Sequence, residues 1–425
     1  MPAPPEHAVA ESHIIARVHA SVLDVDPQAW NALLAQQAHA TPFMRHEYLA
    51  ALETSGSATP RTGWTPRFLT LWDAGALAAA CPLYLKTHSY GEYVFDWAWA
   101  SAYEQHGVPY YPKALVAVPF TPVPGTRLLA RDATARAQLV QAARQWCIEE
   151  DISSLHLLFA AEEDIATCAD QGLMLRHTVQ FHWQNTAPVA PVMSSEATSE
   201  WLAMPNRFTS FDDFLASLAQ EKRKKIKQER RRVADAGVTF RCLQGKAIST
   251  GDWDFFYRCY ERTYLEHGNP PYLSRAFFAD MARTMPEAWV LFIAERDGRL
   301  IASSLIATSA FPASAAGQKD TEIIAYGRYW GALERVDCLH FEACYYQPLQ
   351  WCIEHGVHRF EGGAQGEHKM ARALLPVQTS SAHWLAHPDF AVAVERFLER
   401  EGQGVDAYLQ SLHDRTPFRK TQNPP

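Results

Sequence analysis

Residues 359 to 376 form the stretch of the sequence whose residue types are best suited to catalysis. Their sequence is RFEGGAQGEHKMARALLP. Three glycines fall within five positions, Gly362, Gly363 and Gly366. Glycines let a backbone approach a ligand closely, and the unpaired N–H groups at a helix start attract negative charge. The pattern predicts a strand that ends at Glu361, a glycine turn, and an amphipathic helix from about Glu367 to Pro376.

Four side chains at the start of this predicted helix could support the transfer of an acyl group to an amine. They are Glu367, His368, Lys369 and Arg372. Glu367 or His368 could accept the proton that the amine must lose. Lys369, Arg372 and the backbone N–H groups of residues 363–366 could hold an anionic donor or a developing oxyanion. The alternative is a solvated helix start whose Glu and Lys side chains complement the helix dipole.

The composition indicates a globular protein of two or three domains. The chain has 425 residues, of which 48% are hydrophobic and 12% aromatic, so it can build sizeable cores. Its net charge of −8 excludes a general basic footprint for nucleic acid. The N-terminal residues do not resemble a secretory signal, and the longest apolar run, residues 76–85, covers about half a membrane span. We therefore expect a cytoplasmic protein, with peripheral association at the inner membrane face left open.

The cysteines carry no sign of a metal site. All eight are scattered without any CxxC pair, and most have apolar neighbours. This is typical of reduced, buried thiols and argues against a zinc site or a disulfide framework. We expect no metal in the protein.

A duplicated pattern divides the chain into two similar units. The pentapeptide QWCIE occurs at Gln145–Glu149 and again at Gln350–Glu354, each time near the end of a helical pattern that a short strand follows. Helix, hairpin, strand, helix, strand, helix and strand occur twice in this order, which predicts an α/β fold with mixed sheets flanked by helices. The predicted segments are an N-terminal extension (1–40), a first unit (41–185), a linker (186–207), a second unit (208–388) and a C-terminal helix and tail (389–425).

Five blocks of the sequence resemble a known family. They are residues 82–97, 110–127, 180–183, 326–330 and 360–369. Each unit resembles the GNAT acyltransferase fold, and the tandem is similar to the Fem-type peptidoglycan aminoacyltransferases. Roughly residues 40–420 resemble the FemAB-like N-acyltransferases, also described as peptidoglycan biosynthesis or recognition proteins. The resemblance implies two tandem GNAT-like units, with the active cleft mainly on the second, and transfer of an acyl or aminoacyl group to an amine acceptor.

The sequence departs from the family pattern in one place and from ordinary GNAT enzymes in another. About twenty residues are inserted after Asn185, before Phe211–Leu215. The Q/R-x-x-G-x-G/A pyrophosphate loop of ordinary GNAT enzymes is absent, and its nearest analogues are Pro124–Arg127 and Arg328–Ala332. The resemblance therefore implies either an acyl-CoA or an aminoacyl-tRNA as donor, and a small-molecule or peptide amine as acceptor.

Charged and aromatic residues are interleaved in residues 84–99 of the first unit. Lys86, His88, Glu92 and Asp96 lie there among six aromatic side chains. With Lys113, they could line a cleft in which an acceptor stacks on aromatic rings while the charges orient it. The alternative is a partly buried loop whose charges satisfy one another.

Gly125 and Arg127 follow a predicted strand over residues 115–120. If this strand diverges from its neighbour as in the GNAT fold, both residues would lie where an anionic donor binds. The alternative is a rigid turn followed by a surface arginine.

Arg328 lies in a predicted buried strand, within the sequence YGRYW. A buried arginine requires a partner or a ligand. Glu342 or Glu361 could be that partner, or could contribute to acceptor binding. As a catalytic residue, Arg328 would orient the reacting carbonyl together with Gln365.

Two further pairs of residues have both a functional and a structural interpretation. Tyr345 and Tyr346 could protonate the leaving group, although tyrosines on an amphipathic helix more often belong to the core. His182 and His383 occupy equivalent strand positions in the two units, which favours an architectural role.

A strongly basic segment lies within a predicted long helix over residues 208–236. Eight of the twelve residues from Glu221 to Arg232 are basic and two are acidic. This face could be merely solvated, could contact tRNA phosphates or a lipid-linked pyrophosphate, or could attract a membrane surface. A rival for the whole protein is a non-catalytic peptidoglycan or glycan recognition module, for which the aromatic stretch of the first unit suffices.

Overall fold

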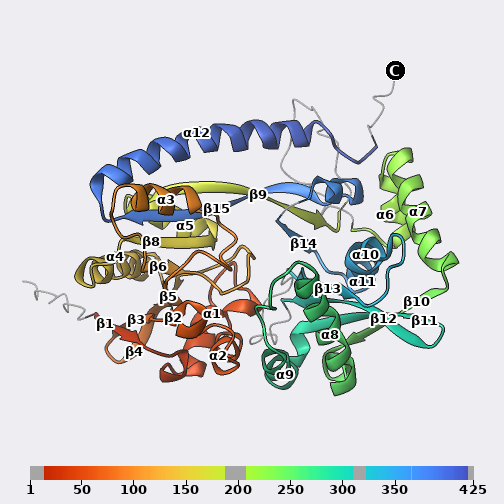
Figure 1. Cartoon of the computed structure of the whole chain (residues 1–425), viewed down its shortest axis with the longest axis horizontal. Helices are drawn as coiled ribbons and strands as arrows, with labels where there is room; N and C mark the ends of the chain where they lie inside the picture. The colour runs from red at the N-terminus through yellow and green to blue at the C-terminus, as the bar shows by residue number, and fades with distance from the viewer. Residues whose placement is uncertain (1–13, 187–206, 310–321, 365, 420–425) are drawn as a thin grey trace, which may run out of the picture.

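One continuous sheet of eleven strands runs through the protein (Figure 1). The computed structural model describes residues 14–186, 207–309, 322–364 and 366–419. The long sheet has the strand order β10-β11-β12-β13-β14-β9-β15-β8-β6-β5-β2, and a smaller sheet has the order β1-β3-β4-β7. Both contain antiparallel pairs, and the long sheet also contains parallel ones. The predicted α/β fold with mixed sheets is therefore confirmed.

The element bounds follow the predicted alternation of strands and helices. The strands are β1 (Ile15–His19), β2 (Trp64–Pro66), β3 (Phe68–Asp73), β4 (Ala76–Cys81), β5 (Leu83–Lys86), β6 (Lys113–Val116), β7 (Leu129–Ala130), β8 (Ser154–Ala160), β9 (Met174–Gln184), β10 (Val238–Gln244), β11 (Trp289–Arg296), β12 (Arg299–Thr308), β13 (Ile324–Ala332), β14 (Arg359–Ala364) and β15 (Leu375–Leu385). The helices are α1 (Pro27–Leu34), α2 (His46–Thr54), α3 (Trp97–Gln105), α4 (Ala133–Glu149), α5 (Glu162–Asp170), α6 (Phe211–Ser217), α7 (Gln220–Asp235), α8 (Thr250–Glu266), α9 (Arg275–Thr284), α10 (Leu339–Phe341), the π-helix η6 (Glu342–Tyr346), α11 (Gln347–Glu354) and α12 (Pro388–His413). Short 3₁₀ helices are η1 (Val22–Asp24), η2 (Pro42–Met44), η3 (Pro60–Thr62), η4 (Gly245–Ala247), η5 (Pro286–Ala288) and η7 (Glu367–Arg372).

The last strand of each predicted unit pairs with the other half of the chain. β9, from the first half (residues 14–186), pairs with β14 of the second half (residues 207–419). β15, from the second half, lies between β9 and β8. Figure 1 shows β9 and β15 crossing from one half to the other beneath α12, which contacts both strands. The two halves are thus joined through a shared sheet.

In each half, two parallel strands are joined by a helix and pair over only three residues. In the second half, β13 and β14 pair from Ile324 with Arg359 to Tyr326 with Glu361, and then diverge. The connecting helix is the continuous run α10, η6 and α11. In the first half, β6 and β8 pair in the same way, and α4 connects them. The divergence of β13 from β14 leaves facing strand edges that are not paired with each other, and we call this place the β13–β14 gap.

The two faces of β13 belong to different cores. Ala325 packs with Phe360 and the α11 side chains in one core. Tyr326 packs in a second core, which includes residues of both halves, and its ring lies 5.2 Å from that of Phe43. We call these the helix face and the inter-half face of β13. A ligand could therefore approach the β13–β14 gap from either of two chemically different sides.

Two predicted helices were wrong in their extent. The predicted helix 208–236 is broken into α6 and α7, because residues 218–219 turn to pair with the C-terminal segment. Leu218 forms a bridge with Phe418, and the Ala219 N–H donates to the carbonyl of Pro417 at 2.9 Å. The predicted helix from Glu367 to Pro376 is only the 3₁₀ helix η7, since Ala373 takes a left-handed φ of 60° and β15 begins two residues later.

Two further predicted elements differ in length. The predicted strand 115–120 ends at Val116, and Phe120 takes a left-handed φ of 57° that a strand cannot contain. The predicted C-terminal helix 390–401 extends to His413 as α12, because it continues along β9 and β15 past Gly402 and Gly404. Most of the predicted linker 186–207 lies outside the described residues.

Candidate active site

Arg328 lies on the edge of the β13–β14 gap at an irregularity of the strand. Leu305 pairs with Tyr329 and Ile306 pairs with Gly327, so Arg328 is an extra residue without a partner in β12. Such a β-bulge re-aims the side chain of the inserted residue. Gly327 allows the ring of Phe360 on β14 to lie close to the backbone of β13, because a Cβ at this position would lie 2.9 Å from that ring.

Four basic side chains gather where the helix after β13 begins, at Leu339. They are His340, His368, Lys369 and Arg372, and we call them the cationic cluster. The Lys369 Nζ donates to the carbonyls of Gly362 at 2.7 Å and Gly363 at 3.2 Å. These two glycines belong to β14, so Lys369 links η7 directly to the gap.

The buried arginine of the cationic cluster is held by the basic helix α7. The Arg372 guanidinium donates to a carboxylate oxygen of Glu229 and to the carbonyl of His368, both at 2.7 Å. It also lies 3.7 Å from the centre of the Phe341 ring. Sequence reasoning missed Glu229, although its spacing from Ile226 and Val233 places all three on the buried face of α7.

The mutual repulsion of these groups affects their protonation. Desolvation, together with the charges of His368, Arg372 and Lys369, lowers the pKa of His340 to about 4. Desolvation lowers the pKa of Lys369 to about 8. The pKa of His368 is also lowered, by desolvation and then by Arg372, Lys369 and Lys225 of α7. Both imidazoles are therefore largely neutral at neutral pH, and an anion bound here would meet their N–H groups together with the charges of Lys369 and Arg372.

Glu361 is the buried carboxyl group at the point where β13 and β14 diverge. Its side chain alternates with that of Phe360 and therefore points to the inter-half face. One carboxyl oxygen lies 3.2 Å from Nε of Arg359, and the other lies 3.9 Å from Nε2 of His182. Burial raises the pKa of Glu361 to about 7, against the charges of Arg359 and Arg127. Glu361 can therefore accept a proton near neutral pH.

The two residues predicted as proton acceptors on η7 have different surroundings. Glu367 is exposed and accepts hydrogen bonds from Tyr408 and Arg415, both at 3.0 Å. His368 Nε2 lies 3.2 Å from the hydroxyl of Tyr345, on the helix that follows β13. Gln365 lies outside the described residues.

The glycines at this point have conformations that favour glycine. Gly363 and Gly366 have left-handed φ values of 75° and 99°. A Cβ on Gly366 would also lie 2.4 Å from the imidazole of His368. These positions set the path from β14 into η7.

The predicted partners of Arg328 were wrong. Its Nη2 donates to the carbonyl of Phe120 at 3.0 Å and to the hydroxyl of Tyr329 at 3.4 Å. Glu342 instead pairs with Arg230 at 2.9 Å, and Glu361 lies beside Arg359. The bulge explains the difference, because an inserted residue changes the direction that simple alternation predicts.

Four of the five candidate residues for acceptor binding in the first half form a buried cluster of charges. Lys113 Nζ donates to Ser89 at 2.8 Å, to Glu92 at 2.7 Å and to Asp96. Lys86 lies 4.0 Å from Glu92, and its Nζ is 3.7 Å from the centre of the Trp64 ring. We call Lys86, Glu92, Asp96 and Lys113 the buried charge cluster. His88 lies apart from it and accepts the N–H of Tyr90 at 3.2 Å.

Burial shifts the protonation of the charge cluster. It lowers the pKa of Lys86 to about 7 and raises that of Glu92 to about 7. Burial tends to raise the pKa of Asp96, but the charge of Lys113, the charge of His156 and hydrogen bonds from Lys113 and Ser89 together lower it. Since the side chains of Lys86 and Lys113 are fully buried, this arrangement corresponds to the alternative in which the charges satisfy one another.

Arg127 and Gly125 are engaged by the fold of the first half. Arg127 is 1% exposed and donates to the carbonyls of Leu158 at 3.0 Å, Gly125 at 3.2 Å and Val123. A Cβ on Gly125 would lie 2.5 Å from Cγ2 of Thr41, so this glycine allows two chain segments to approach. Both residues of the first half are therefore occupied by contacts within the protein.

The fold of the chain is that of two tandem GNAT-like units. FemX has a TM-score of 0.50 to this chain at 10% identity, covering 87% of this chain and 98% of FemX. The C-terminal domain of a protein assigned as a lysylphosphatidylglycerol synthetase from Agrobacterium fabrum has the same TM-score and identity, with 88% and 96% covered. A tandem GNAT protein of clavulanic acid biosynthesis has a TM-score of 0.42 at 13% identity, with 88% and 99% covered.

The chain belongs to the FemAB-like family, described as peptidoglycan biosynthesis/recognition, whose model matches residues 21–420. No curated protein matches the sequence. Family and fold make the protein a transferase of the Fem and GNAT type at the level of acyl or aminoacyl transfer, as the sequence predicts. Within the described residues, no helix has the length and apolarity to cross a bilayer.

Proposed function

We propose that the protein transfers an acyl or aminoacyl group from a phosphate-bearing donor to an amine, within the β13–β14 gap. The observation that carries this proposal is the arrangement at that gap. The cationic cluster lies at one side, at the start of the helix after β13, and the buried Glu361 lies at the other. Anion binding and proton acceptance are the two tasks that acyl transfer to an ammonium acceptor requires.

The chemistry divides between these two sides. Glu361 takes a proton from the acceptor ammonium, and the free amine attacks the carbonyl carbon of the donor. The unpaired edges of β13 and β14 offer backbone N–H groups to the oxyanion. The C–N bond forms as the bond from carbon to the donor's sulfur or oxygen breaks. The attacking nitrogen then loses its second proton, which passes to the leaving group through water or through Tyr345, whose hydroxyl is bonded to His368.

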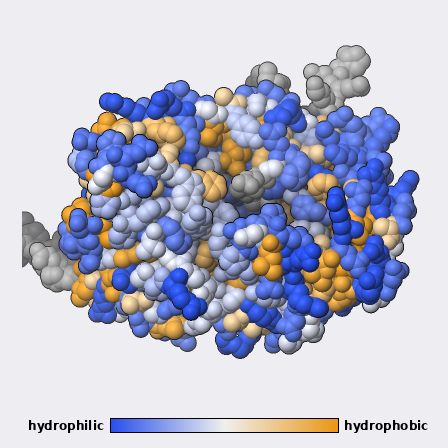
Figure 2. All heavy atoms as spheres, in the orientation of Figure 1, coloured by the Kyte–Doolittle hydropathy of each residue, from blue (hydrophilic) through white to orange (hydrophobic). Residues whose placement is uncertain are grey.

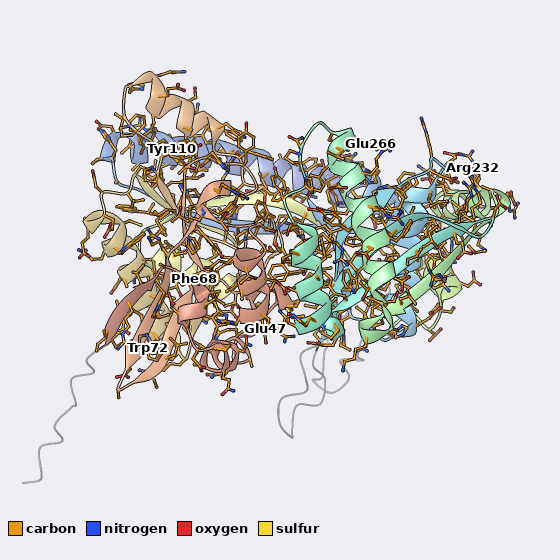
Figure 3. All side chains as sticks on the ribbon, turned by 60° about the horizontal axis from the view of Figure 1, so that its bottom comes forward. Glu47, Phe68, Trp72, Tyr110, Arg232 and Glu266 are labelled. Carbon is orange, nitrogen blue, oxygen red and sulfur yellow. The ribbon has the colours of Figure 1, made fainter. Side chains whose placement is uncertain are left out.

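Of the two possible donors, acyl-CoA and aminoacyl-tRNA, the basic helix α7 favours aminoacyl-tRNA. Its exposed basic residues are Lys224, Lys225, Lys227, Arg231 and Arg232. Lys225 contributes to the low pKa of His368, so the basic face of α7 adjoins the cationic cluster. The surface over α6 and α7 is largely hydrophilic (Figure 2), and Arg232 lies at the opposite end of the molecule from Tyr110 (Figure 3). Such a face suits a longer polyanion, whereas the cationic cluster alone suffices for the phosphates of an acyl-CoA.

A thermal-shift titration with CoA, acetyl-CoA and aminoacylated tRNA tests the donor. A ligand at 100 times its Kd adds roughly 2.7 kcal/mol to the stability of the native state. If tRNA is the donor, Lys225→Gln should weaken its binding and lower the slope of log K against log salt by about one. Lys246→Gln, at an exposed lysine outside α7, is the matched control and should change neither.

The outcomes separate three functions. A shift with CoA compounds that is unaffected by Lys225→Gln supports an acyl-CoA donor. A salt-dependent shift with tRNA supports an aminoacyl-tRNA donor. Saturable binding of cell-wall fragments without turnover of either donor would contradict the proposal and favour a recognition module.

A further inference from the structure

Arg328 carries a charge that the protein itself does not neutralise. Its side chain is half-buried, and its Nε is buried without a hydrogen-bond partner. Its contacts are the carbonyl of Phe120, the hydroxyl of Tyr329 and the rings of Phe43 and Tyr329. Within the described part of the chain, Arg328 forms no ion pair with a carboxylate, whereas Arg230, Arg359 and Arg372 each lie beside a glutamate. A guanidinium that is partly removed from water normally has an anionic partner.

Tyrosines from both halves lie near enough to this guanidinium to interact with its charge. Tyr48 on α2 and Tyr93 before α3 come from the first half, and Tyr264 on α8 and Tyr329 on β13 come from the second. The positive charge of Arg328 acts on Tyr48, Tyr93 and Tyr264, opposing the rise in pKa that burial causes. Burial outweighs this opposition, so the hydroxyls of Tyr48, Tyr93 and Tyr264 stay protonated at neutral pH and can donate hydrogen bonds. An arginine among hydroxyl donors is a chemical environment that binds a carboxylate.

A rim of aromatic side chains lies beside these groups. Tyr272 stacks on Phe120, with ring centres 4.8 Å apart, and contacts Tyr264 at 5.6 Å. Tyr90 and Trp97 from the first half contact each other at 5.0 Å and are 61% and 42% exposed. The rim gives an apolar surface on which the body of a ligand can rest while its charged end reaches Arg328.

The site lies on the opposite face of β13 from the cationic cluster. Tyr329, next to Arg328, packs in the inter-half core with Tyr326. Trp330, one residue further, contacts His340 of the cationic cluster at 5.3 Å. Glu361 also points to the inter-half face. A ligand bound by Arg328 would therefore share its side of the gap with the proton acceptor and leave the other side to the donor.

We propose that Arg328 and the hydroxyls of Tyr48, Tyr93, Tyr264 and Tyr329 bind the carboxylate of the acceptor, so that the acceptor is an amine that also carries a carboxylate. This assignment rests on the proposed transfer in the β13–β14 gap, and it names the class of acceptor. It also gives the aromatic stretch of the first half a part in acceptor binding, through Tyr90, Tyr93 and Trp97. Since the two halves each supply hydroxyls, the site exists only in the assembled tandem.

The test compares free acids with their amides by isothermal titration calorimetry. The probes are L-alanyl-L-alanine, D-alanyl-D-alanine and the C-terminal amide of each. The wild-type protein should bind at least one acid about 10- to 100-fold more tightly than its amide, because hydrogen bonds to a charged group contribute about 1.5–3 kcal/mol. Arg328→Met should remove the difference, and Arg328→Lys should keep part of it. Equal affinity for acids and amides, or an acid affinity that Arg328→Met leaves unchanged, would overturn the proposal.

Two further variants keep the result interpretable. Tyr264→Phe removes one hydroxyl and retains the ring, so it should weaken acid binding selectively even if Arg328→Met folds poorly. Glu361→Gln should leave the preference for the acid intact while turnover falls. A preference for the acid without turnover by the wild-type protein would reject the transferase proposal and leave the carboxylate site standing.

Discussion

Replacing Glu361 with Gln should lower turnover by about 10²- to 10⁴-fold without unfolding the protein, the range expected when a general base is lost. Gln has the shape of the protonated carboxyl group and cannot accept the amine proton. Glu361 is 4% exposed, with one oxygen near Arg359 and the other near His182. Turnover of the wild-type protein should rise with pH through about 7, the pKa of Glu361, and the residual turnover of the variant should lose that step.

The stability of the same variant should depend on pH in a defined direction. Burial raises the pKa of Glu361 in the folded state above its ordinary value of 4.5, so the folded protein binds the extra proton between pH 4.5 and 7. The stabilisation that this proton gives is fully present below pH 4.5 and is lost as pH rises through 7. Glu361→Gln should lack this loss, and denaturant unfolding should show it becoming more stable relative to the wild type as pH rises.

Glu354→Gln is the matched control for both measurements. Glu354 is an exposed glutamate at the end of α11, where it bonds Gln350. It should leave turnover and the pH profile unchanged. If Glu361→Gln turns over as fast as the wild-type protein and keeps the step near pH 7, Glu361 is not the proton acceptor. His368 would then be the next candidate.

The repeat in the sequence was sufficient to predict the tandem fold, but not how the halves are joined. The two QWCIE segments lie in equivalent helices, α4 and α11, each connecting two parallel strands. Later in each half, β9 and β15 have similar sequences, each with His-Trp immediately before its last residue. Local patterns cannot tell which half such strands will pair with, because either half offers a compatible edge. The exchange of β9 and β15 is decided by long-range packing.

The glycine-rich stretch lies at the site that we propose, but its residue types did not single out Glu361 as a proton acceptor. It drew attention to Glu367, which is exposed and bound to Tyr408 and Arg415. Glu361, at the end of the preceding strand, is the carboxyl group that burial brings to a pKa of about 7. Burial depends on the tertiary arrangement of β9, β13 and β14, which spacing does not reveal. The misassigned partners of Arg328 have a similar origin, since a bulge of one residue has no sequence signature here.

The two halves use the same topology differently. In the first half, the polar groups near the parallel strands β6 and β8 are bonded to one another. Arg127 donates to backbone carbonyls, and Asp164 accepts the backbone N–H groups of Arg127 and Leu128. In the second half, the corresponding gap is bordered by the cationic cluster and by Glu361. This asymmetry supports a single transfer centre, with the first half acting as a scaffold that also contributes to acceptor binding.

Replacing Lys113 with Met should destabilise the protein by about 3–5 kcal/mol, because it removes the cation that compensates two buried carboxylates. Lys113 is fully buried and donates to both Glu92 and Asp96. The difference in the free energy of unfolding between the wild-type protein and Lys113→Met should become smaller towards acid pH. The pKa of Asp96 is depressed in the folded protein, so its pairing contributes stability above its ordinary pKa of 3.8 that is lost as pH falls. Urea unfolding at several pH values measures both effects.

Two comparisons distinguish loss of this compensation from a general effect of removing a lysine. Lys246→Met replaces an exposed lysine and should change the free energy of unfolding only slightly. Adding Glu92→Gln and Asp96→Asn to Lys113→Met should restore much of the lost stability, because the uncompensated charges are then absent. If Lys113→Met costs no more than Lys246→Met, the cluster is hydrated and open to ligands, and the first half would regain its place as a direct acceptor site. A large cost that the triple variant relieves would instead show that these charges serve the fold, and it would leave Arg328 as the charge of the inter-half face that requires a ligand.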